Sequence, residues 1–347
     1  MSSSNRSAMA AWLIAASLAG SVSAPAEAAD FYAGKTVTIL VGTDESGGFS
    51  LYSRLVAPYL SRTLPGAPAV IVRNLPGAGG STAATYMTQQ APRDGTILAT
   101  VPPNAMMDRL FGRKTQVDAT QFGFVGGAER GTRLCVVSAR SGLTTLADAI
   151  KSKAIIGATQ QGSPTSDYAN FLKRSTDATF SIVNGYSGTG ALYLALERGE
   201  IDGICGVDWT ALKAQMPGAL RDKSMHVLVQ FNEQPDPELT EMGVAQPWSH
   251  IHRDIDHKAV KLMVNFQQAF GKAYFVPPQT PTEQLGLLQK AFTEILNNQR
   301  LLKDAKKQRL DVHSVGADEV AHTVHELYRA PKDVIERLEQ LTSDTGR

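Results

Sequence analysis

One kind of junction limits the possible folds of this chain: a short apolar strand ends in a glycine-rich turn, and a helix follows at once. The first example reads VTILVGTDESGGFSLYSR over residues 37–54. The apolar run Val37–Val41 predicts a buried strand, and Leu51–Leu60 has helical spacing. A turn of this kind points the free backbone N–H groups of the helix start toward whatever lies above the strand end.

The same junction recurs along the chain. Alternating strands and helices predict α/β units with parallel sheets, in which ligands bind beyond the carboxyl ends of the strands. The turns fall into two groups, before and after about residue 130, so the sequence predicts two lobes with a site between them. Further strands are expected over residues 69–72, 96–101, 134–137, 154–158, 180–183, 201–205 and 227–231, and helices over 82–90, 167–174 and 191–198.

The C-terminal part is expected to be mostly helical from about residue 254. Thr282 precedes a run of helix formers and predicts an N-terminal cap for a helix that ends near Asn297. The segment Val320–Leu341 predicts a closing amphipathic helix, interrupted near Pro331.

The N-terminus has the pattern of an export signal. Arg6 is the only charge before the apolar run of residues 8–22, and Ala26-Glu27-Ala28 has the small-residue spacing of a cleavage site. Because the run is too short to span a bilayer, we expect a signal peptide over residues 1–28, cleaved near Ala28. The alternative is an uncleaved anchor.

Charge and cysteine content limit the classes of binding partner and the cellular compartment that the sequence predicts. The 347 residues carry a formal net charge of +1, which does not favour nucleic acid or an anionic membrane surface as a partner. An exported protein meets an oxidising compartment, so Cys135 and Cys205 either pair or serve as small buried apolar residues. The sequence alone leaves both alternatives open.

Enzymatic motifs are approached but not completed. Residues 33–36 end like a phosphate-binding loop but lack its first glycine, and residues 77–82 lack the last glycine of a dinucleotide fingerprint. Ser187 lies in GYSGT, which lacks the last glycine of a nucleophile elbow. The histidines and acids of residues 250–257 fit no compact metal template, so we expect a solvated segment there. No catalytic residue, metal or cofactor is therefore predicted.

The turns instead supply backbone and side-chain hydrogen-bond donors without a strong nucleophile or base, which is typical of a binding site. For any single turn the glycines could simply permit a tight bend, but several such turns at successive strand ends favour a shared site. The candidate contacts from these turns are Thr43, Gly77, Ala78, Gly79, Asn104, Gln160 and Tyr186.

Several segments, taken in order, resemble the Bug family, the extracytoplasmic solute receptors of tripartite tricarboxylate transporters. The similarity covers about residues 30–235 and is carried by FYAGKTVTI (31–39), the Gly47-Gly48 loop, NLPGAGG (74–80), APRDGT (91–96), GYSGT (185–189) and LERGEIDG (196–203). The resemblance implies a type II periplasmic-binding-protein fold, with lobe one formed by residues 29–132 plus 232–347 and lobe two by residues 133–231. The strands at 134–137 and 227–231 are the expected crossovers.

The resemblance also implies a function. A monomeric periplasmic receptor would capture a small organic acid and deliver it to membrane permease subunits. A secreted enzyme using the same cleft and a ligand sensor for a signalling partner are the alternatives. The implied contacts to a carboxylate are Ser46, Gly47, Gly48 and Ser50 in lobe one, with Ser163, Thr165, Ser166, Ser187, Gly188, Thr189, Asp208 and Trp209 in lobe two. In such a fold the strands carrying Cys135 and Cys205 would lie side by side, which would bring the two cysteines close enough for a disulfide.

The first loop departs from the family pattern. Asp44 and Glu45 stand where a Pro-Pro or Pro-Gly pair is usual, and Ser50 falls where an Asp is expected. Two acids beside an anion site would repel a carboxylate unless they point away from it. The charge of the ligand therefore stays open between a carboxylate and an amide or amine.

Overall fold

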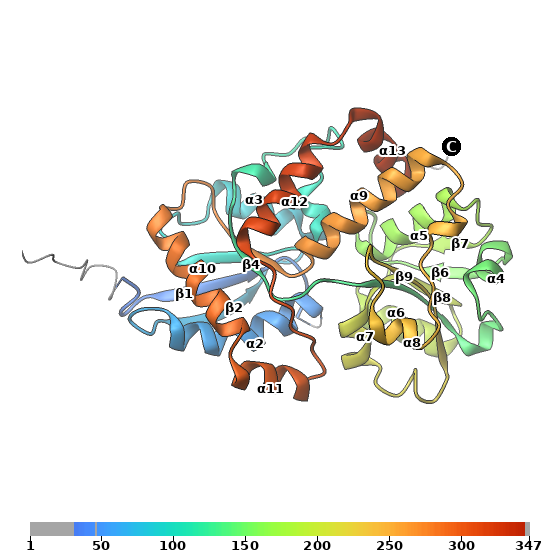
Figure 1. Cartoon of the computed structure of the whole chain (residues 1–347), viewed down its shortest axis with the longest axis horizontal. Coiled ribbons are helices and arrows are strands. Elements are labelled where there is room, and N and C mark those ends of the chain that lie inside the picture. The colour runs from blue at the N-terminus through green and yellow to red at the C-terminus, as the bar shows by residue number, and fades with distance from the viewer. Residues whose placement is uncertain (1–30, 46, 344–347) are drawn as a thin grey trace, which may run out of the picture.

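The chain folds into two five-stranded mixed sheets that lie side by side, each covered by helices (Figure 1). The computed structural model describes residues 31–45 and 47–343; the predicted signal peptide and Ser46 lie outside the described residues. The first sheet has the order β2-β1-β3-β10-β4 and the second the order β7-β6-β8-β5-β9. We call the first sheet with its covering helices lobe one, and the second sheet with its covering helices lobe two.

The two sheets repeat one plan. In the order of each sheet, the first three strands are parallel to one another. An antiparallel strand, β10 or β5, pairs with the third of them. Lobe one contains β1 (Thr36–Val41), β2 (Ala69–Asn74), β3 (Ile97–Thr100), β4 (Gly123–Gly127) and β10 (Ala273–Val276). Lobe two contains β5 (Arg133–Ser138), β6 (Ile155–Gly157), β7 (Ser181–Val183), β8 (Gly203–Asp208) and β9 (Met225–Phe231). The predicted parallel α/β units are confirmed.

Strand β1 shows why its sequence is apolar without interruption. Ile39 and Val41 pack into the cluster formed with α2 and α10, whereas Leu40 packs on the opposite face with Ala83 and Met87 of α3. A parallel sheet covered on both faces buries both sets of side chains. The helices are α2 (Gly48–Thr63), α3 (Ser81–Gln89), α4 (Leu146–Lys151), α5 (Pro164–Ser175), α6 (Thr189–Arg198), α7 (Trp209–Gln215), α8 (Pro237–Glu241), α9 (Asp254–Phe270), α10 (Thr282–Leu296), α11 (Gln299–Lys307), α12 (Ala317–Arg329) and α13 (Lys332–Thr342).

The chain passes between the lobes in at least two places within the described residues. Residues 128–132 lead directly from β4 to β5, and the return runs through α8 and the long helix α9, which lies between the two sheets in Figure 1. The predicted crossover strands are β5 and β9, which pair with each other inside lobe two. Leu239 of α8 packs with the core of lobe two, and α13 contacts α5. The division at residues 132 and 231 stays a prediction.

The C-terminal prediction is confirmed in outline and wrong in one detail. Residues 254–270 and 282–342 are mainly helical, and Pro331 separates α12 from α13. Thr282, however, is the first residue of α10, and Pro281 holds the cap position, where no side chain caps the helix. Strand β10 was not predicted because its four residues lie between helix-forming stretches.

Cys135 and Cys205 form a disulfide between the neighbouring antiparallel strands β5 and β8. They are directly opposed in the register, and their Cα atoms are 3.9 Å apart. Both residues are buried. Of the two alternatives that the sequence left open, pairing is the one found.

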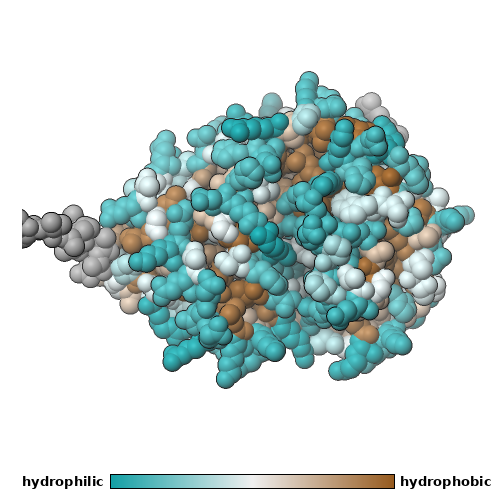
Figure 2. All heavy atoms as spheres, in the orientation of Figure 1, coloured by the Kyte–Doolittle hydropathy of each residue, from teal (hydrophilic) through white to brown (hydrophobic). Residues whose placement is uncertain are grey.

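The molecular surface is largely hydrophilic on the face seen in Figure 2, with hydrophobic residues confined to separate patches. Within residues 31–45 and 47–343, the helices are all too short or too polar to span a bilayer.

Candidate functional site

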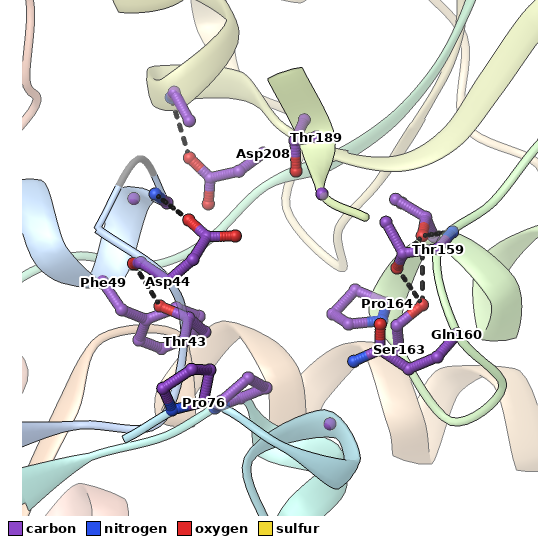
Figure 3. A pocket seen from close by; sticks show the side chains of 18 of the residues that line it. Thr43, Asp44, Phe49, Pro76, Thr159, Gln160, Ser163, Pro164, Thr189 and Asp208 are labelled. Carbon is purple, nitrogen blue, oxygen red and sulfur yellow. Dashed lines mark hydrogen bonds between the residues drawn. The ribbon is translucent and has the colours of Figure 1, made fainter. Parts of the chain in front are cut away.

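A cavity of about 740 Å³ lies between the lobes, where the carboxyl ends of the parallel strands of both sheets face one another (Figure 3). Its size is in the range of small-molecule sites. Lobe one lines it with Gly42, Thr43, Asp44, Gly47, Gly48, Phe49, Pro76, Gly77, Ala78, Gly79, Pro102 and Lys272. Lobe two adds Arg133, Thr159, Gln160, Gln161, Ser163, Pro164, Thr165, Ser187, Gly188, Thr189, Tyr193, Gly206, Val207, Asp208, Ala211 and Gln215.

The lobe-one wall is the loop between β1 and α2, held from behind by two polar side chains. The Ser50 hydroxyl donates to the carbonyl of Asp44 at 2.8 Å, and the Asn74 amide donates to the carbonyls of Thr43 and Asp44 at 2.8 and 3.1 Å. These bonds fix the loop, and Gly47 and Gly48 at the start of α2 line the cavity.

The lobe-two wall is a triangle of hydroxyl groups at the N-terminus of α5. The Thr159 hydroxyl donates to Ser163 Oγ at 2.7 Å and lies 2.9 Å from Thr165 Oγ1, and the last two are 3.0 Å apart. Ser163 is the N-cap of α5 and accepts from the Ser166 N–H. Since hydroxyl groups can rotate, this cluster can offer donors to an anion at the positive end of the helix.

Gly206 in β8 sets how closely α5 approaches the sheet. Its φ is +70°, and a Cβ atom there would lie 2.2 Å from the carbonyl oxygen of Pro164, the first residue of α5. Only glycine combines that backbone conformation with that contact. The hydroxyl triangle is therefore positioned by a glycine that is distant from it in the sequence.

The floor of the cavity carries a buried charged network that joins the lobes. Lys272 Nζ lies 2.9 Å from Asp208 Oδ2 and 3.0 Å from Glu129 Oε2, and the Thr210 hydroxyl donates to Glu129 Oε1 at 2.6 Å. Arg133 Nη1 lies 3.7 Å from Asp208 Oδ2. All these side chains are almost fully buried. The cations compensate the acids, so the floor is close to electrically neutral.

The network shifts the pKa values of its acids in opposite directions. Burial raises the pKa of Glu129 to about 7, and the nearby Asp208 carboxylate adds to the rise. Burial also opposes ionisation of Asp208, but the Lys272 ammonium and the Arg133 guanidinium outweigh it and lower the pKa of that carboxyl. Asp208 is thus the ionised partner of Lys272.

Thirteen of the predicted contacts line the cavity. They are Thr43, Gly47, Gly48, Gly77, Ala78, Gly79, Gln160, Ser163, Thr165, Ser187, Gly188, Thr189 and Asp208. Ser46 lies outside the described residues. Whether these residues contact a ligand stays a prediction.

Five predicted contacts lie away from the lining: Ser50, Asn104, Ser166, Tyr186 and Trp209. Ser50 and Ser166 are fully buried. The Ser50 hydroxyl donates to the Asp44 carbonyl, and Ser166 Oγ accepts from the Asn170 amide. The Asn104 side chain accepts from the Gln267 amide at 3.0 Å. Trp209 starts α7 and is buried in the core of lobe two.

Arg133 and Lys272 are lining residues that the sequence analysis missed. Each precedes or begins an antiparallel strand, β5 or β10. The amino end of an antiparallel strand lies at the same edge as the carboxyl ends of its parallel neighbours, so a charged residue just before such a strand reaches the cavity. That signal was available for Arg133, which directly precedes the predicted strand 134–137.

Of the two acids in the first loop, one faces the cavity and one does not. Asp44 lines the cavity. Glu45 has a side chain that is 82% exposed and pairs with Arg54 at 3.6 Å. The predicted conflict between an anion and these acids therefore concerns Asp44 alone.

Solved structures with the same arrangement of two lobes were found over nearly the whole chain. MatC from Rhodopseudomonas palustris with bound malate is 18% identical, with 89% of this chain and 99% of that chain covered and a TM-score of 0.65. A protein from the same organism with adipate is 20% identical. The match covers 88% of this chain and 97% of that chain, with a TM-score of 0.63. This chain has the fold of the periplasmic solute-binding proteins. The periplasmic binding protein BugD is 16% identical, with 90% and 99% covered and a TM-score of 0.68.

The predicted type II periplasmic-binding-protein architecture is confirmed by these solved structures. No family model and no curated protein matches the sequence. In the part of the chain that the structure describes, no group of three or more His, Cys, Asp or Glu residues could hold a metal ion.

Proposed function

We propose that this protein is a solute receptor that binds a small organic acid between its lobes and presents it to the membrane permease subunits of a tripartite tricarboxylate-type transporter. The observation that carries the proposal is the hydroxyl triangle of Thr159, Ser163 and Thr165 at the start of α5, in a cavity whose lobe-one wall is the glycine-bearing start of α2. The starts of two helices, α2 and α5, thus line one cavity, and a helix start favours an anion.

The fold supports the same proposal. The structural neighbours include a periplasmic binding protein and two proteins with bound malate and adipate. We further propose that the mature protein is a periplasmic monomer, released by cleavage near Ala28, and that it binds its ligand without transforming it. Closure of the lobes around residues 128–132 and α9 would report capture to the permease.

A thermal-shift screen of the mature protein tests this function. The panel holds malate, adipate, citrate and aromatic acids beside amides, amines and amino acids. A ligand at about 100 times its Kd adds about 2.7 kcal/mol to the free energy of unfolding, which raises the midpoint by several degrees. We expect at least one organic acid to do so. A shift produced by amines or amides, with none from any acid, would contradict the proposal.

A further inference from the structure

Asp44 is fixed on lobe one with its carboxylate directed into the cavity. Its carbonyl is held by Ser50 and Asn74, and its Oδ1 accepts the N–H of Gly47 at 3.0 Å. The backbone and one carboxylate oxygen are thus both anchored to the loop between β1 and α2. Figure 3 shows the Asp44 side chain pointing away from that loop, toward the side of the cavity that carries Thr189 and Asp208.

The other carboxylate oxygen reaches lobe two. A Cβ atom built on Gly188 would lie only 3.0 Å from Asp44 Oδ2. Gly188 has a φ of 178°, an extended conformation that any residue can adopt, so the backbone does not require glycine there. The lack of a side chain at this position instead lets the Asp44 carboxylate approach.

Gly188 is the N-cap of α6, a helix of ten residues, and as a glycine it has no side chain of its own to cap the helix start. The backbone N–H groups of a helix start carry a partial positive charge and favour a nearby anion. Asp44 brings such an anion from the opposite lobe. The acid next to it in the sequence, Glu45, points into solvent and makes no such contact across the cavity.

We propose that Asp44 is a built-in anion that holds the ligand-free protein closed and competes with carboxylate ligands for the start of α6. A ligand carboxylate that enters this part of the cavity meets the Asp44 charge and must displace it. The hydroxyl triangle of α5 is left for the first carboxylate of the ligand. The Asp44 charge therefore disfavours ligands that carry a second carboxylate group.

Two variants separate this role from a general charge effect. Asp44→Asn keeps the shape and an acceptor for the Gly47 N–H but removes the charge. Glu45→Gln removes the neighbouring charge, which does not face the cavity. Gly188→Ala should act like Asp44→Asn, because its methyl group would push the carboxylate away.

Small-angle X-ray scattering of the ligand-free mature protein tests the closed state. Asp44→Asn and Gly188→Ala should have a larger radius of gyration than the wild type, and Glu45→Gln should match the wild type. Equal radii for Asp44→Asn and Glu45→Gln would overturn the proposal. This comparison uses no ligand, so it decides the role of Asp44 even if organic-acid binding, on which the competition depends, is disproved.

Isothermal titration with malate and adipate tests the competition. Asp44→Asn should bind at least one of them roughly tenfold more tightly than the wild type, a typical size for coupling between a ligand and a conformational change. Glu45→Gln should bind like the wild type. Weaker binding by Asp44→Asn would overturn the proposal, since Asp44 would then assist the ligand.

Discussion

Lys272 of lobe one and Asp208 of lobe two form a buried ion pair across the floor of the cavity, with Nζ and Oδ2 2.9 Å apart. The Lys272 ammonium also lies 3.0 Å from Glu129 Oε2. One ammonium group therefore lies within ion-pair distance of two buried carboxyl groups. Lys272 thus links the start of β10 in lobe one to the end of β8 in lobe two.

Lys272→Met should lower the free energy of unfolding by about 3–5 kcal/mol, because it removes the cation nearest to two buried carboxyl groups. Lys261→Met is the matched control, since Lys261 pairs with Glu233 at 2.7 Å but both side chains are more than two-fifths exposed. The control should change stability by less than about 1 kcal/mol. Urea unfolding measures both, and equal effects would show that the buried pair contributes no more than an exposed one.

Asp167 should make the protein less stable as the pH rises. Burial at the start of α5 raises the pKa of its carboxyl to about 8, well above the value in an unfolded chain, so the folded state retains a proton that the unfolded state releases. This contribution to stability is complete below the unfolded pKa and is lost as the pH rises through about 8.

Asp167→Asn should remove that slope. The wild type and the variant should differ most in their pH dependence between about pH 4 and about pH 8, as measured by urea unfolding. Glu129, whose pKa is raised to about 7, is present in both proteins and does not enter the difference. Parallel stability curves would mean that Asp167 titrates as in the unfolded chain.

The disulfide should stabilise the fold mainly by restricting the unfolded chain. Cys135 and Cys205 are 70 residues apart, and closing a loop of this length is worth about 4 kcal/mol in the chain-entropy model. Unfolding in the presence of a reductant should show this loss for the wild type. The double variant Cys135→Ala/Cys205→Ala should be insensitive to the reductant, and a wild type that is also insensitive would contradict the stabilising role.

The sequence predicted the parallel strands and thirteen of the residues that line the cavity, because both depend on local patterns. Gly77–Gly79 and Ser163–Thr165 were found at the ends of apolar strands, where the fold places its ligand. Lys272 could not be found in this way, since β10 is a four-residue antiparallel strand inserted from a distant part of the chain.

Ser50 and Asn104 show a second limit of local patterns. Both are polar residues in or next to turns, yet their side chains turn inward to hold the loops rather than toward the cavity. The direction of such a side chain depends on partners far away in the sequence, such as Gln267 for Asn104. Asp44 illustrates the same point, because only the fold brings it beside Gly188.

The anion site at the start of α5 is tested most directly by the affinity of Ser163→Ala for an organic acid, measured by isothermal titration. The acid used is the one that gives the largest thermal shift. Ser175→Ala is the control, since Ser175 is a buried serine at the other end of the same helix, and its hydroxyl has no hydrogen-bond partner among residues 31–45 and 47–343. A hydrogen bond to a charged group contributes about 1.5–3 kcal/mol, so we expect Ser163→Ala to bind at least about tenfold more weakly and Ser175→Ala to bind like the wild type. Undiminished binding by Ser163→Ala would contradict an anion site at the start of α5.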